Sequence, residues 1–219
     1  MAAAMASGAF AASGRKILET KCSSCHNLTG PSPTTLKGMR ERKGPDLFYA
    51  GNKYKREWVE AWLQKPERIR PAGMFYGNHL KDGKDQDVVD TETLKPHMSL
   101  DAREAKAVSK RLAKLKKKKK LIKKKDYKEG TISMSMGEML FDKFRGCLAC
   151  HQIEPGYGGS SAPEVYTAAK RLQENYMISY MRNPKAWDPK TVMPSKYIRE
   201  RDLQKFVHYM RGLSKESFE

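Results

Sequence analysis

The chain has 219 residues, with 43 Lys and Arg against 25 Asp and Glu, and its formal net charge is +18. This length is enough for two small domains, neither of which can build a large core from its own side chains. Half of the positive excess lies in residues 112–128, which hold ten lysines and one aspartate. The rest of the chain is therefore only mildly basic, which speaks against the extended basic surface of a nucleic-acid-binding protein.

The first twelve residues are small and apolar. Within them, Ala9, Phe10 and Ala11 form a segment similar to the cleavage site of a signal peptide. No basic region precedes it, and the run is too short to span a bilayer. We expect residues 1–12 to be a shortened signal sequence or a disordered leader, and no later segment predicts a transmembrane helix.

Two copies of Cys-x-x-Cys-His follow, and they use all four cysteines of the chain. They are Cys22-Ser23-Ser24-Cys25-His26 and Cys147-Leu148-Ala149-Cys150-His151. Cysteines three apart on a helical turn present both sulfurs to one side, where they can form thioethers with the vinyl groups of a haem. The histidine then serves as the proximal iron ligand. We predict two covalently bound haem c groups, with His26 and His151 as metal ligands and Cys22, Cys25, Cys147 and Cys150 as attachment points.

Three other interpretations of such a motif stay open. These are a thioredoxin-like redox pair, a zinc site of cysteine and histidine ligands, and structural disulfides. Two complete motifs, each ending in histidine and each set in the same larger pattern, favour haem over all three.

That larger pattern is an internal repeat. Gly14 and Gly137 each lie ahead of a motif, which predicts an N-terminal helix that another helix can cross closely. After the motifs the halves realign at Pro45 and Pro163. In this register, the aromatic pairs at helical spacing are Trp58 and Trp62 in the first half and Tyr176 and Tyr180 in the second.

The repeat continues through a proline and a methionine in each half. Pro66 and Pro184 end the aromatic helix, and each opens a loop with a methionine, Met74 in the first half and Met193 in the second. Apolar residues at helical spacing then predict a last helix over residues 101–115 and again over 200–213. The expected fold class is all-α, with about three helices around each haem and no convincing strands.

Each half resembles a class I cytochrome c, and the whole chain resembles the tandem dihaem cytochromes c of bacterial respiratory chains. The resemblance rests on the two haem motifs and on Met193-Pro194, and it leaves out an insertion near residues 77–96. It implies a first cytochrome domain at 13–113, a lysine-rich linker at 114–130 and a second domain at 131–219.

The resemblance also implies the remaining contacts of the haems. The carbonyl groups of Pro45 and Pro163 would hold the proximal histidines, and Met193 would be the distal ligand of the second haem. For the first haem we prefer Met74, by its place in the repeat, with Met98 and His97 as rivals. His79 and His208 are interpreted as surface or loop histidines.

A haem with both axial positions filled exchanges electrons and binds no substrate. The resemblance therefore implies a respiratory electron carrier, not an enzyme, in the periplasm where haem is attached, with protein redox partners and no nucleic acid. The lysines of residues 116–125 predict a solvated spacer or a docking element for an acidic partner or an anionic membrane surface. Two alternatives stay open: a dihaem enzyme, peroxidase-like or thiosulfate-oxidising, and an electron-transfer subunit of a larger oxidoreductase complex.

Overall fold

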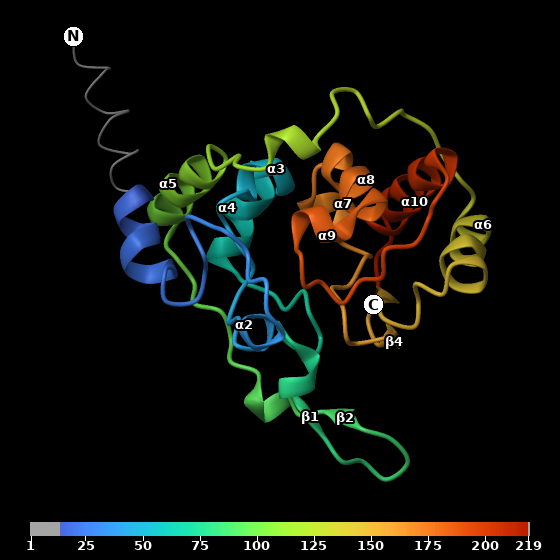
Figure 1. Ribbon diagram of the computed structural model, residues 1–219, viewed down its shortest axis with the longest axis horizontal. Helices are drawn as coiled ribbons and strands as arrows, with labels where there is room; N and C mark the ends of the chain where they lie inside the picture. Colours follow the sequence, from blue (N-terminus) through green and yellow to red (C-terminus); the bar gives the residue numbers. More distant parts are fainter. Residues whose placement is uncertain (1–13, 219) are drawn as a thin grey trace.

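The computed structural model describes residues 14–218, so the predicted leader at 1–12 lies outside the described residues. These residues are mainly helical, with two short hairpins (Figure 1). The α-helices are α2 (Leu36–Arg40), α3 (Ala50–Lys53), α4 (Arg56–Gln64), α5 (Ala102–Leu112), α6 (Met134–Met139), α7 (Ala168–Arg171), α8 (Glu174–Arg182), α9 (Pro184–Trp187) and α10 (Glu200–Leu213). None of the helices described is long and apolar enough to cross a membrane.

Shorter elements complete the chain. The π-helical turns are Leu18–Cys22 and Leu140–Phe144, and the 3-10 turns are Tyr76–Asn78, Thr91–Thr93 and Lys119–Leu121. The antiparallel hairpins pair β1 (Leu80–Lys81) with β2 (Val88–Val89) and β3 (Gln152–Glu154) with β4 (Tyr157–Gly158). The sequence did not predict these hairpins. The first lies inside the insertion near 77–96 and projects from the helical body (Figure 1).

The helices pack around two separate cores. One is made of apolar residues between Leu18 and Leu112, and the other of apolar residues between Leu140 and Leu213. The last helix of the second half, α10, begins and ends as predicted. The last helix of the first half, α5, begins one residue after the predicted start, because Asp101 is its N-cap, and ends three residues before the predicted 115.

The predicted repeat register is visible in the helices themselves. A shift of 118 residues carries α3 onto α7 and α4 onto α8 with identical lengths. The halves also touch through equivalent residues, since Tyr54 forms an antiparallel bridge with Leu172. On either side, Lys55 N donates to Arg171 O and Gln173 N donates to Lys53 O, both at 2.9 Å. The two halves are thus related locally by a pseudo-two-fold axis.

An aromatic seam joins the halves beside this bridge. Its buried members are Phe48 and Tyr49 from the first half and Tyr176 and Trp187 from the second. Trp187 is fully buried, with its ring centre 5.4 Å from that of Tyr49 and 4.7 Å from that of Tyr176. The halves therefore share apolar surface as well as a covalent linker.

The lysine-rich linker runs along this seam, and part of it is structural. Lys117 Nζ donates to Thr29 O at 2.7 Å, while Lys118 Nζ donates to Ala186 O at 2.9 Å and to Trp187 O. Burial lowers the pKa of Lys118. By contrast, the other lysines of residues 116–125 are exposed, namely Lys116, Lys117, Lys119, Lys120, Lys123, Lys124 and Lys125. The solvated spacer that the sequence predicts describes these exposed lysines and not Lys118.

The two glycines ahead of the motifs lie where helices cross, as predicted. A Cβ atom on Gly14 would clash with the backbone oxygen of Ala107 in α5, and one on Gly137 would clash with the ring of Tyr209 in α10. Each close crossing places the helical segment that leads into a Cys-x-x-Cys-His motif against the last helix of its own half.

Candidate haem attachment sites

Both Cys-x-x-Cys-His motifs fold into the same tight turn. In the first, His26 N donates to Cys22 O at 2.9 Å, and in the second, His151 N donates to Cys147 O at 3.1 Å. The turn of the first motif directly follows the π-helical turn Leu18–Cys22, whereas in the second half the π-helical turn ends three residues before Cys147. Two segments with different internal residues thus adopt one local geometry.

The thiols of these motifs form no disulfides. All four cysteines are free, so the structure contains no disulfide between them. Burial raises the pKa of Cys22, and it raises the pKa of Cys147 to about 11. The reactive cysteine of a thioredoxin-like pair has a lowered thiol pKa, since its reactive form is the thiolate. Within residues 14–218, no group of three or more His, Cys, Asp or Glu is arranged to hold a metal ion.

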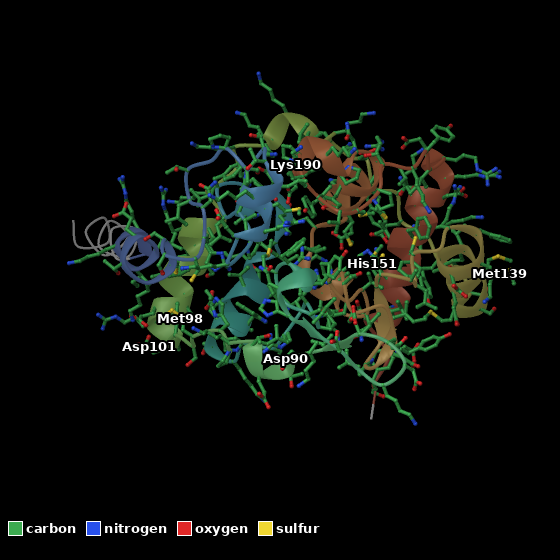
Figure 2. All side chains as sticks on the ribbon, turned by 60° about the horizontal axis from the view of Figure 1, so that its bottom comes forward. Asp90, Met98, Asp101, Met139, His151 and Lys190 are labelled. Carbon is green, nitrogen blue, oxygen red and sulfur yellow. The ribbon has the colours of Figure 1, made fainter. Side chains whose placement is uncertain are left out.

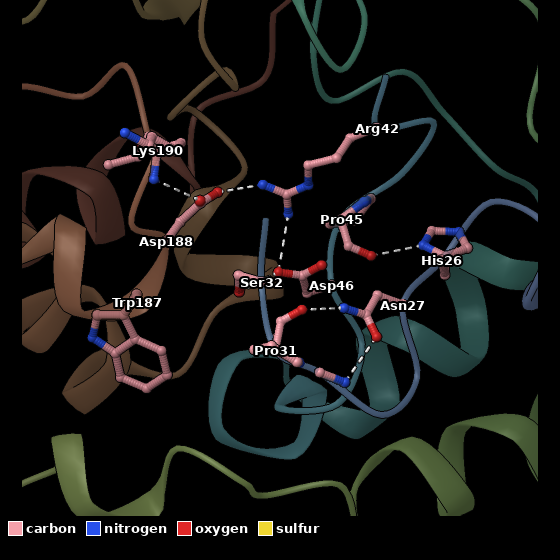
Figure 3. Close-up of polar contacts among 12 residues, drawn as sticks. His26, Asn27, Pro31, Ser32, Arg42, Pro45, Asp46, Trp187, Asp188 and Lys190 are labelled. Atoms are coloured by element: carbon pink, nitrogen blue, oxygen red, sulfur yellow. Dashed lines mark hydrogen bonds and ion pairs between the residues drawn. The ribbon is translucent and has the colours of Figure 1, made fainter. Parts of the chain in front are cut away.

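The histidine of each motif makes the contact with a proline carbonyl that the resemblance implies. The Nδ1 atom of His26 lies 2.8 Å from the carbonyl oxygen of Pro45 (Figure 3). The Nδ1 atom of His151 lies 2.6 Å from the carbonyl oxygen of Pro163. A carbonyl oxygen only accepts, so Nδ1 carries the proton and Nε2 is left with a lone pair for a metal. Burial lowers the pKa of both imidazoles, which favours this neutral form.

A cavity of about 310 Å³ opens beside the first motif, lined by Cys25, His26, Arg42 and Gly44 among others. Arg42 pairs there with Asp46 at 3.2 Å and with Asp188 of the second half at 2.5 Å (Figure 3). These contacts leave its Nε atom buried without a hydrogen-bond partner. A buried unpaired donor at the edge of a cavity suits an anionic ligand group such as a haem propionate.

The second half also has a buried arginine Nε atom without a hydrogen-bond partner. Arg145, two residues before Cys147, pairs with Asp202 at 3.0 Å, and its Nε atom is also buried without a partner. Three observations fit covalently attached haem. The thiols are free to form thioethers, the imidazoles are held at Nδ1, and each half has a buried arginine donor without a partner, which could bind a propionate. Nothing in the residue spacing marks Arg42 or Arg145, and the sequence analysis missed both.

The distal candidates differ in their surroundings. Met193 is partly buried and packs against the second core. Met74 is also partly buried, but its loop is held toward the second half, where Ala72 N donates to Ser160 O at 3.2 Å. Met98 is 44% exposed and lies at the surface beside α5 (Figure 2). His97 is the candidate that lies beside His26, with ring centres 6.1 Å apart.

The other two histidines lie away from the motifs. His79 Nδ1 is 2.8 Å from the Thr93 hydroxyl in the insertion, and His208 Nε2 is 2.9 Å from Lys128 O. Both contacts agree with the interpretation of these residues as loop or surface histidines.

Comparison with models of protein families, with curated proteins and with solved structures found no match to this chain.

Proposed function

We propose that this protein is a dihaem c-type cytochrome that carries single electrons between respiratory redox partners. The observation that carries the proposal is the pair of Cys-x-x-Cys-His turns, each with its histidine Nδ1 bonded to the carbonyl of a proline in equivalent register. A free imidazole Nε2 next to two unpaired thiols is what covalent haem attachment needs.

In this proposal the cysteines attach the haems and the histidines bind the irons. Cys22 and Cys25 would tether one haem and Cys147 and Cys150 the other, while His26 and His151 would bind the irons. Pro45 and Pro163 fix the imidazole planes, since a ring held at Nδ1 cannot rotate away from the metal. Bound haem supplies one-electron Fe(II)/Fe(III) chemistry, and an axial methionine such as Met193 raises its reduction potential.

Covalent haem attachment normally takes place on the periplasmic side of a membrane, and this supports export of the protein. In that compartment the partners would be a protein electron donor and a protein electron acceptor, with nucleic acid excluded by location. A place as the electron-transfer subunit of a larger oxidoreductase complex is compatible with the same residues.

An electron carrier and a haem enzyme differ in whether one coordination position of an iron is free to bind a substrate. The holoprotein from a haem-maturing host should show two reversible one-electron reductions, should not bind carbon monoxide when reduced, and should not turn over peroxide. Met193→Ala is the positive control, because it should open the second haem to carbon monoxide. Rapid binding or peroxide turnover by the wild-type protein would instead identify a peroxidase-like dihaem enzyme.

The exposed lysines of the linker predict how a partner docks. Replacing Lys119, Lys120, Lys123, Lys124 and Lys125 with glutamine should slow electron exchange with an acidic redox protein several-fold at low salt, because clustered charge steers encounter. The difference should shrink as ionic strength rises. Lys118 is left unchanged, since it contacts the second half. If the wild type and the glutamine variant exchanged electrons at equal rates in stopped-flow measurements at low salt, this segment would act only as a spacer.

A further inference from the structure

The imidazole of His97 lies opposite that of His26 in the first half. Their ring centres are 6.1 Å apart and their planes are inclined by 55°. Metal–imidazole nitrogen bonds are about 2 Å long, so one ion that binds a nitrogen of each ring holds the two ring centres roughly 6 Å apart. The two rings therefore stand at the separation of two ligands on opposite sides of one iron.

Both rings are anchored by the same nitrogen. His26 Nδ1 lies 2.8 Å from Pro45 O, and His97 Nδ1 lies 2.7 Å from Met98 O. Since each carbonyl accepts the Nδ1 proton, Nε2 is the nitrogen that each ring can offer to a metal. Such backbone anchoring is typical of metal-binding histidines.

The side chain of His97 is exposed, and contacts with α4 position it. Its ring centre lies 4.7 Å from that of Trp62 in α4, and the indole Nε1 of Trp62 donates to Glu67 O at 3.0 Å. Just beyond His97, Leu100 N donates to Leu63 O at 2.8 Å. The segment that carries His97 is therefore fixed to the aromatic helix of the first half, and α5 begins five residues after it.

In the second half, the segment before the last helix carries a methionine in place of a histidine. Met193 lies seven residues before α10, in the segment that leads into the last helix of that half. Residues 152–207 contain no histidine. The two halves thus present different ligand types from equivalent segments, histidine in the first and methionine in the second.

We propose that His97, and not Met74, is the distal ligand of the first haem, which makes the first site bis-histidine and leaves the second site His151 and Met193. The proposal rests on the proposed function, because it assigns the second axial ligand of a haem that the first motif would attach. It replaces the preference for Met74 that the repeat suggested.

Unequal ligands give the two sites unequal potentials. An axial methionine raises the potential of a haem above that of a site without it, so the first site should have the lower potential and the second the higher. In a half-reduced molecule, the single electron then resides at the second site. The chain would act as a directional carrier with its electron entry side in the first half.

The test uses the ferric holoprotein and the weak near-infrared charge-transfer band that methionine ligation produces. The wild-type band should have the intensity of one haem for every two attached. Met193→Ala should abolish it, whereas Met74→Ala and Met98→Ala should leave it unchanged. These three variants leave His97 in place, so the result does not depend on whether a His97 variant folds.

Variants of His97 supply the second readout. His97→Ala should keep two haems, let one of them bind carbon monoxide when reduced, and leave the near-infrared band intact. His97→Met should raise the lower of the two midpoint potentials. His79→Ala is the matched control, a loop histidine of the same half, and should change neither the spectrum nor the potentials.

Two results would overturn the assignment. A wild-type band with the intensity of two haems, half of which disappears in Met74→Ala, would restore Met74 as the ligand. Absence of carbon monoxide binding in a folded His97→Ala protein would remove His97. Haem content, measured as the alkaline pyridine complex, separates these results from failure of the proposed function, in which no haem is attached at all.

Discussion

A protein in which Cys147 and Cys150 are both replaced by alanine should mature with one haem instead of two. In the proposed function each haem would be held by the two thioethers of a single motif, so loss of both sulfurs in one half should leave the other half unaffected. Intact-mass spectrometry of protein from a haem-maturing host measures the number directly. The wild type should carry the added mass of two haems, and the mirror variant with Cys22→Ala and Cys25→Ala should also carry one.

Ser23→Ala is the matched control, because it changes the first motif without touching a sulfur or the histidine, and it should retain both haems. A wild-type protein that carries zinc, or a single haem, would contradict the proposed function. The same samples show how far haem supports folding. With a modest aliphatic core in each half, we expect the half that lacks its haem to lose protection from proteolysis first.

Replacing Trp187 with alanine should lower the free energy of unfolding by about 3–5 kcal/mol, the usual cost of removing a large buried aromatic side chain. Trp187 is fully buried in the seam, and its Nε1 donates to Ser179 Oγ at 3.0 Å. The variant should therefore also leave that hydroxyl without its indole donor. Urea denaturation followed by far-UV circular dichroism measures the loss.

Because Trp187 contacts Tyr49 across the seam, its removal should also uncouple the two halves. A single unfolding transition in the wild type should become two in the variant. Tyr197→Ala is the control: this ring is 85% exposed in the same half, and its loss should change stability by less than about 0.5 kcal/mol. A Trp187→Ala protein that unfolds in one transition with wild-type stability would show that the seam does not couple the halves.

Local patterns predicted the parts of the fold that depend on neighbouring residues. The helix over 200–213 was found at its full length because its apolar residues recur at helical spacing. The contacts of His26 with Pro45 and of His151 with Pro163 were also predicted, through the resemblance to class I cytochromes. The mainly helical class follows from the same patterns.

Contacts between distant segments were not predictable in this way. The seam around Trp187 and the partial burial of Lys118 depend on how the halves sit together, which no local period encodes. The distal ligand proposed for the first site is a similar case. The repeat favoured Met74 by alignment, but the insertion near 77–96 breaks the alignment, so that only the folded chain shows His97 beside His26.

The paired contacts around Tyr54 and Leu172 have a consequence for assembly. Each half meets its partner through the same stretch of its own surface, which is the isologous geometry of a symmetric dimer. In two separate chains, such pairing would weaken on dilution. Here the linker keeps each half at a high effective concentration relative to the other, so the spacing of the two Cys-x-x-Cys-His sites does not depend on the protein concentration. The chain therefore has the arrangement of a symmetric dimer whose two subunits are covalently linked.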